Sequence, residues 1–167
     1  KIDYVHKDGF DNTDNVDNYM YFKRAFSDSE IRIIKSIQDF RKSSKTQWLY
    51  DKISKYLKIS NRDMWNFDID GISLIKKVVL NHKNTHHSKF TVNNCQKRKI
   101  KIIINLDSSE NIEGGCEQIM TSNNARNIPS TSGTIILFPS FVLCRTDALK
   151  EGSRSFLLCW AIGSYFR

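Results

Sequence analysis

The stretch that decides the fold lies in the last third of the chain, between Glu113 and Arg167. It contains, in order, Glu113-Gly114-Gly115, then Gly133-Thr134-Ile135-Ile136-Leu137-Phe138-Pro139-Ser140, then Gly152-Ser153-Arg154, then Trp160. The apolar runs at 133–138 and 156–162 are typical of strands, and the glycine-rich segments between them are typical of turns. We also expect a short strand near 116–120.

The alternation of apolar residues continues upstream of this stretch. Ile100, Ile102, Ile104 and Leu106 fall on one face of a strand, and Ile103 falls on the opposite face. A second alternating set predicts a strand between 72 and 80: Ile72, Leu74, Val78 and Leu80. Before residue 72 the apolar residues follow a helical period instead.

Two helices and a short edge strand are predicted in the first 60 residues. Ser27 and Glu30 have the spacing of a capping box, with Phe26 and Ile31 as a hydrophobic staple, so a helix should start at Ser27 and run to about Phe40. A second helix is expected from Trp48 to Ser60, with Leu49, Ile53, Tyr56 and Leu57 on its buried face. The segment 19–22 should form a short edge strand. Helices followed by alternating strands predict an α+β fold in which the helices back an antiparallel sheet.

The composition favours one globular domain. The chain has 167 residues, of which 40% are hydrophobic, and no apolar run approaches the roughly 20 residues of a membrane span. Residues 1–18 are polar and rich in Asp and Asn, which predicts an N-terminal arm that orders against a partner, followed by a single domain over 19–167. The net charge of +8 leaves a nucleic-acid partner open. The four cysteines form no C-x-x-C pair, which favours reduced thiols in a cytoplasmic setting.

The ordered landmarks resemble the iron(II)/2-oxoglutarate dioxygenases, specifically the prolyl-4-hydroxylase-like group of phages and bacteria. Besides the C-terminal stretch, the resemblance rests on Trp48-Leu49-Tyr50-Asp51, Asn61, Trp65-Asn66-Phe67-Asp68, Gly71 and Asn105-Leu106-Asp107. It covers nearly the whole chain after about residue 20. The resemblance implies a double-stranded β-helix (a jelly roll, cupin-like) whose major sheet is supported by N-terminal helices.

The resemblance also implies where a cofactor site should lie. In this family a His-x-Asp/Glu motif and a distal histidine hold iron, and an arginine on the last strands pairs with 2-oxoglutarate. Arg154 stands at the place of that arginine, although Phe156 replaces the small polar residue that members often carry two places on. The metal positions are degenerate: Lys89, Thr91 and Cys144 in one register, or His87, Lys89 and Cys144 in the other.

A count of histidines excludes the distal ligand. The histidines are His6, His82, His86 and His87, so none follows residue 87. Several alternatives stay open for the metal positions and for Arg154. The three later histidines and Cys144 could form a nitrogen/sulfur site for zinc or copper, or Cys144 could be a small buried hydrophobe. A lysine at the old metal position could replace the charge of the cation inside the barrel, and Arg154 could persist as a structural ion-pair partner or still bind a small carboxylate.

These observations lead to three hypotheses about function. The first is a catalytically degenerate protein (a pseudoenzyme) without a cofactor, which serves as a structural or interaction component of a phage or virus particle, located in the host cytoplasm or the virion. The second is an active oxygenase that uses iron(II) and 2-oxoglutarate with unusual ligands. The third is a basic nucleic-acid-binding module. Under the first, Tyr19, Tyr21 and Phe22 are candidate partner anchors, or else they pack as an edge strand within the domain.

Overall fold

Strand β9 (Ser153–Ile162) is the longest described strand and organises the main sheet. The structure is a computed structural model, and it describes residues 19–81, 90–91, 97–108, 114–115, 117–121 and 124–164. In the main sheet the order is β1-β7-β4-β9-β2, with β3 also paired to β9, and every pairing is antiparallel. Its other strands are β1 (Met20–Phe22), β2 (Gly71–Ile72), β3 (Lys76–Asn81), β4 (Arg98–Asn105) and β7 (Ile135–Pro139).

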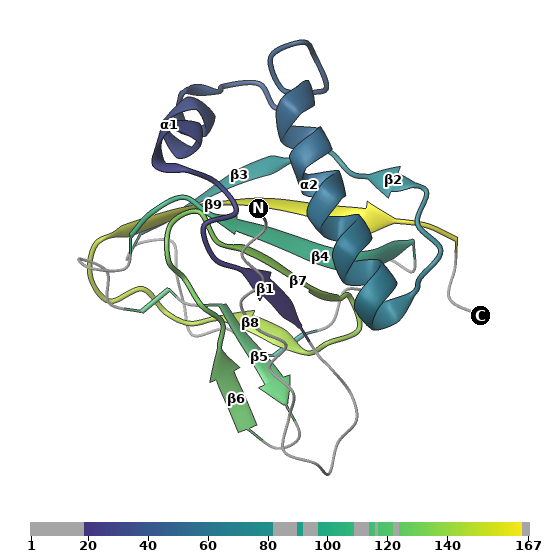
Figure 1. The fold of residues 1–167 in the computed structure, drawn as a ribbon. Coiled ribbons are helices and arrows are strands. Elements are labelled where there is room, and N and C mark those ends of the chain that lie inside the picture. Colours follow the sequence, from purple (N-terminus) through teal and green to yellow (C-terminus); the bar gives the residue numbers. More distant parts are fainter. Residues whose placement is uncertain are drawn as a thin grey trace.

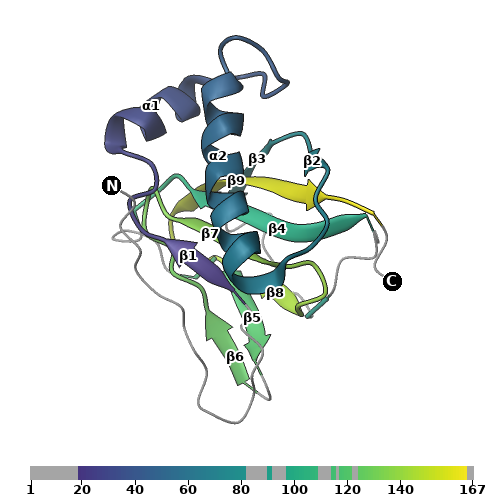
Figure 2. The same ribbon diagram turned by 45° about the vertical axis from the view of Figure 1, so that its right-hand side comes forward.

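A smaller sheet faces the main one. It has the order β6-β5-β8, formed by β5 (Glu117–Thr121), β6 (Asn124–Asn127) and β8 (Cys144–Thr146). Helices α1 (Asp28–Ser36) and α2 (Gln47–Ser60) lie on the opposite face of the main sheet, and a π-helical turn (Asn61–Trp65) follows α2. Both views show this arrangement, with α2 crossing the sheet and β5 and β6 on the side away from the helices (Figures 1 and 2). The predicted α+β jelly-roll-like fold with supporting N-terminal helices is confirmed.

The alternation of side chains along β4 separates two hydrophobic cores. Ile100, Ile102 and Ile104 are buried between the sheet and the helices, together with the apolar face of α2. Ile103 points to the other side, into the interior between the two sheets, where Phe156 of β9 also packs. Both assignments follow the prediction, because successive strand residues point to opposite faces.

The first helix starts as predicted and ends early. The Ser27 hydroxyl accepts a hydrogen bond from the Glu30 amide at 3.2 Å, and the Ser27 amide donates to the Glu30 carboxylate at 2.9 Å, which completes the capping box. The helix ends at Ser36 and not near Phe40, because Ile37 adopts an extended conformation while its amide bonds the Ile34 carbonyl.

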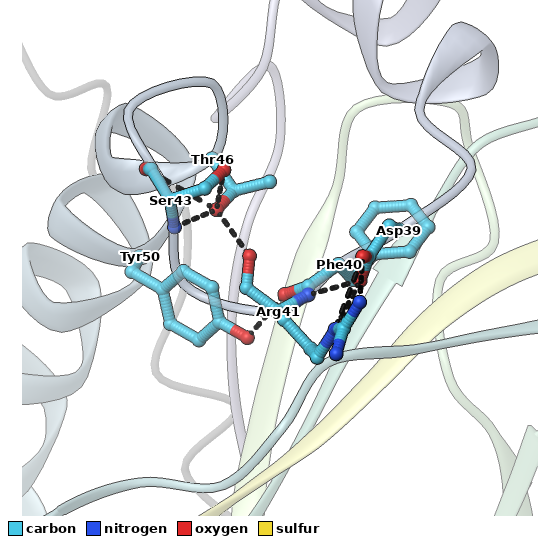
Figure 3. A network of polar contacts seen from close by, with 6 residues as sticks. All are labelled: Asp39, Phe40, Arg41, Ser43, Thr46 and Tyr50. Carbon is cyan, nitrogen blue, oxygen red and sulfur yellow. Dashed lines mark hydrogen bonds and ion pairs between the residues drawn. The ribbon is translucent and has the colours of Figure 1, made fainter.

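The link between the two helices is fixed by hydrogen bonds (Figure 3). The Thr46 hydroxyl donates to the Arg41 carbonyl at 2.8 Å, and the buried Tyr50 hydroxyl donates to the Phe40 carbonyl at 2.6 Å. The same Tyr50 oxygen accepts from the Ile75 amide at 3.2 Å. One α2 side chain therefore ties the linker before it to the segment that leads into β3.

Two sequence-based expectations are corrected here. The single strand expected over 72–80 is broken into β2 and β3, because Ser73 bonds Trp160 through its amide and its hydroxyl and so leaves the regular ladder. The candidate partner anchors Tyr19, Tyr21 and Phe22 are all buried, so they pack within the domain as an edge strand beside β7 and cannot anchor a partner. The arm over 1–18 lies outside the described residues, and its extent stays a prediction. None of the described helices has the length and apolarity that a membrane crossing requires.

We predict that Ile102→Ala lowers the free energy of unfolding by about 2–5 kcal/mol, since it removes a fully buried side chain and leaves a cavity. The matched control is Ile33→Ala on α1, where the side chain is 52% exposed and the expected change is within about 0.5 kcal/mol. Urea unfolding followed by circular dichroism measures both. Equal losses in the two variants would contradict the assignment of the core.

Asp107 should make part of the free energy of unfolding depend on pH in the acidic range. Burial would raise the pKa of Asp107, but hydrogen bonds from Lys35 and Ser155 outweigh burial and hold the pKa below its ordinary value of 3.8. A carboxyl with a lowered folded pKa contributes stability that is present above 3.8 and is lost as the pH falls through the folded value. We expect Asp107→Asn to flatten the loss of stability below pH 3.8, and Lys35→Met to flatten it only partly. Urea unfolding across acidic pH tests this, and an unchanged slope in Asp107→Asn would contradict it.

Candidate functional site

The interior between the two sheets holds polar side chains from β4 and β9. On β4, Lys101 and Asn105 are each an even number of residues from the inward-facing Ile103. On β9, Arg154 stands two residues before the inward-facing Phe156. The alternation therefore sends two cationic side chains into the space that the resemblance assigns to iron and 2-oxoglutarate.

Lys101 forms a buried ion pair with Glu117 of β5. Its Nζ lies 3.0 Å from Glu117 Oε1, and the two side chains are 15% and 3% exposed, respectively. The other carboxylate oxygen accepts a hydrogen bond from the Thr146 hydroxyl at 3.0 Å. Lys101 Nζ also lies 3.7 Å from Cys144 Sγ of β8. Three strands, β4, β5 and β8, thus meet at one charged cluster.

The electrostatics keep this ion pair charged and the thiol neutral. Burial alone would lower the pKa of Lys101, but the attraction to Glu117 outweighs burial, so the pKa is raised and the ammonium persists. Burial raises the pKa of the Cys144 thiol, and the opposing effect of Lys101 does not cancel that increase. Because the thiol stays protonated at neutral pH, Glu117 is the anion that balances Lys101.

Two predicted metal positions are brought together beside this cluster. Thr91 and Cys144 form an isolated antiparallel bridge, in which each amide donates to the carbonyl of the other at 2.9 and 3.0 Å. In the first register these residues hold the carboxylate and distal histidine positions, and their assignment as metal positions stays a prediction. Lys89 and His87 fall outside the described residues, as do His6, His82 and His86.

The described residues do not fit an iron(II) ion at this place. Thr91 offers only a hydroxyl, the Cys144 thiol is protonated, and Glu117 already balances an ammonium. A divalent cation about 4 Å from that ammonium would be repelled by about 8 kcal/mol at an effective dielectric constant of about 20. Within the ranges that the structure describes, no three His, Cys, Asp or Glu side chains come together as a metal site.

Arg154 is buried and donates hydrogen bonds to groups of two other segments. Its guanidinium donates to the Gly115 carbonyl and, at 2.6 Å, to Asn105 Oδ1, and it lies 5.0 Å from the centre of the Phe156 ring. The Asn105 amide in turn donates to the Pro129 carbonyl at 3.1 Å. Phe156 therefore packs against the guanidinium at the place where the family carries a small polar residue. Whether Arg154 binds a small carboxylate stays a prediction.

Sequence reasoning missed Lys101, Glu117 and Asn105 as members of the site. Lys101 belongs to a basic run over 97–101, which by its composition alone is typical of a solvated surface. The signal that could have found it is the strand alternation itself, because Lys101 and the inward-facing Ile103 share one face of β4. The sequence leaves open that Lys89 replaces the charge of the metal ion, and Lys89 lies outside the described residues. The ammonium that the structure places beside the Thr91–Cys144 bridge belongs to Lys101.

Solved structures resemble this chain over most of its length. A prolyl-4-hydroxylase from Pseudomonas putida superposes with a TM-score of 0.68 at 7% identity, covering 88% of this chain and 93% of that chain. The fold is that of the prolyl-4-hydroxylases. The viral collagen prolyl hydroxylase of Paramecium bursaria Chlorella virus-1 gives a TM-score of 0.64 at 17% identity, covering 96% of this chain and all of that chain. A Burkholderia pseudomallei member of the 2OG-Fe(II) oxygenase family gives 0.61 at 12% identity, covering 90% and 88%.

Sequence comparisons find no corresponding relative. No protein-family model matches the chain, and a search of curated proteins finds no match. The structural likeness at these low identities establishes the prolyl-4-hydroxylase fold, and the activity has to be argued from the site.

We predict that Lys101→Met lowers the free energy of unfolding by about 3–5 kcal/mol, because it leaves the Glu117 carboxylate buried without its cation. Replacing both partners, as Lys101→Met with Glu117→Leu, should recover most of that loss, since two apolar side chains have no charge to desolvate. Urea unfolding of the two single variants and the double variant gives the coupling energy.

The matched control for this cycle is Arg41→Gln, which breaks an exposed ion pair with Asp39 and should leave the unfolding midpoint unchanged. A double variant as unstable as Lys101→Met would show that the pair contributes nothing as a unit.

Proposed function

We propose that this chain is a non-catalytic form of the prolyl-4-hydroxylase fold that works through a surface, as a structural or interaction component of a phage or virus particle. The observation that carries the first half of this proposal is the Lys101–Glu117 ion pair beside Cys144. It brings an ammonium group, with its own counter-ion, next to the position of the distal metal ligand. The Lys101 ammonium is thereby balanced by a carboxylate of the protein itself.

The second polar group in the interior supports the same proposal. An arginine that binds 2-oxoglutarate presents its guanidinium to a carboxylate. Arg154 instead donates to the Gly115 carbonyl and to Asn105, and the Phe156 ring packs against it. These bonds join β9 to β4 and to the segment before β5, which supports a structural role for Arg154.

A viral setting draws support from one structural neighbour. A truncated form of the viral collagen prolyl hydroxylase is covered over its whole length by this chain, so a domain of this fold exists in a viral protein. That neighbour is described as an enzyme, whereas the interior of this chain carries the ion pair described above. The nucleic-acid alternative has only the net charge of +8 in its favour.

An anaerobic titration with iron(II) and 2-oxoglutarate tests the non-catalytic half of the proposal. We expect no metal-to-ligand charge-transfer absorption and no rise in the unfolding temperature, since the ammonium of Lys101 opposes a second cation. The Pseudomonas putida prolyl-4-hydroxylase serves as the positive control under the same conditions. Stoichiometric iron with a 2-oxoglutarate-dependent absorption band would contradict the proposal and support an oxygenase with unusual ligands.

A further inference from the structure

The linker between α1 and α2 forms one wall of a pocket on the helical side of the molecule. The pocket has a volume of about 890 Å³ and is lined by the end of α1 and by linker residues between Ile37 and Lys45. In Figure 1 this linker lies at the top, on the side of the main sheet away from β5 and β6. Small-molecule sites in proteins are usually clefts of about 300–1,000 Å³. The pocket is therefore large enough to hold a small organic ligand.

Hydrogen bonds from two buried side chains hold the linker in one shape (Figure 3). The Thr46 hydroxyl accepts a hydrogen bond from the Ser43 amide at 3.0 Å and donates one to the Arg41 carbonyl at 2.8 Å. The Tyr50 hydroxyl donates to the Phe40 carbonyl at 2.6 Å. A wall that is fixed before a ligand arrives has less conformational entropy to lose on binding.

The charged side chains of the wall leave two cations without an anion. Both carboxylate oxygens of Asp39 accept hydrogen bonds from the Arg41 guanidinium, at 2.7 to 3.1 Å. These bonds hold the pKa of Asp39 at about 2, so the two side chains cancel each other's charge. Lys42 and Lys45 also line the pocket, and neither forms an ion pair within the part of the chain that the structure describes. With three cations and one anion, the wall carries a net charge of +2.

The start of α2 adds a partial positive charge beside these lysines. The helix begins at Gln47, two residues after Lys45, and its first turn contains no acidic side chain. The Thr46 hydroxyl is engaged within the linker and does not cap the helix. The amino end of a helix favours a nearby anion. The two ammonium groups supply most of the positive charge, and the helix end reinforces it.

The uncharged part of the wall offers an apolar contact. Ile33 is 52% exposed, Ile37 is partly buried against the helical core, and both line the pocket. A phosphate monoester carries a charge of about −1.5 to −2 at pH 7, which matches the +2 of the wall better than the single charge of a carboxylate does. Lysine is also a common phosphate-binding side chain. The wall thus matches a phosphate group that is attached to an apolar ring or chain.

We propose that this pocket binds a small organic phosphate, with the phosphate group toward Lys42 and Lys45 and the apolar part of the ligand against Ile33 and Ile37. Asp39 limits the affinity, because it engages the guanidinium of Arg41 and adds a negative charge to the wall. The pocket lies on the helical side of the main sheet, so its ligand does not depend on whether the barrel interior is catalytic.

A titration of the full chain with phenyl phosphate, followed by two-dimensional NMR of the backbone amides, tests the proposal. We expect saturable shifts of the amides between 33 and 45. Replacing both lysines, as Lys42→Gln with Lys45→Gln, should weaken the affinity about tenfold, which corresponds to about 1.4 kcal/mol. Asp39→Asn should strengthen it, because the change removes a negative charge and releases the Arg41 guanidinium. Inorganic phosphate should bind more weakly than phenyl phosphate, since it has no apolar part.

The matched control is Lys55→Gln with Lys58→Gln, which removes the same charge from exposed positions of α2 that do not line this pocket. Lys55 lies about 12 Å along the helix from Gln47, so at 0.15 M salt screening should leave the affinity of this variant unchanged. Unshifted amides in β4 and β9 show that each variant is folded. The proposal is overturned if phenyl phosphate causes no saturable shift between 33 and 45, or if the two double variants lose equal affinity. Phenol binding as tightly as phenyl phosphate would also overturn it, because the phosphate group would then contribute nothing.

Discussion

The ion pair between Lys101 and Glu117 places a buried positive and a buried negative charge in the barrel interior and connects the two sheets. A carboxylate that is 3% exposed is costly to bury unless a cation and hydrogen bonds satisfy it. Lys101 supplies the cation from the main sheet, and Thr146 supplies a hydrogen bond from the smaller sheet. The two sheets are thus held to one relative position by a polar contact as well as by the apolar side chains between them. The same contact leaves a protonated thiol, and not an imidazole, beside the charge.

The second buried cation extends this arrangement along the interior. Arg154 connects β9 to Asn105 of β4 and to the Gly115 carbonyl just before β5. Gly115 has a φ of 71°, which favours glycine, and a Cβ there would meet the Leu149 side chain at 2.9 Å. The Gly114-Gly115 segment that marks the resemblance therefore brings a backbone carbonyl close enough to receive the guanidinium. In this way landmarks of an enzyme fold serve the packing of the barrel.

On the outer face of the main sheet, the helices contribute in a different way. Their core is apolar, and described ion pairs lie at its border, such as Lys35 of α1 with Asp107 at 2.8 Å. Lys52 of α2 likewise pairs with the capping residue Glu30 of α1 at 2.8 Å. These half-exposed pairs orient the two helices on the sheet. The buried polar groups on the inner face are the ones that bear on function.

The sequence by itself determined the elements whose signals are local. The capping box at Ser27, the apolar face of α2 and the alternation along β4 all depend on residues within one or two turns or along one strand. It also excluded a distal histidine, because that conclusion needs only a count. The tertiary structure alone decided the break after β2, which depends on Ser73 bonding Trp160 some 87 positions away. The tertiary structure also decided that Lys101 lies beside Cys144. The partners of its ammonium come from β5 and β8, which are far from β4 in the chain. The hydrophobic pattern of a strand selects its buried face, whereas the choice of partner strand, and with it these contacts, is made by the tertiary fold.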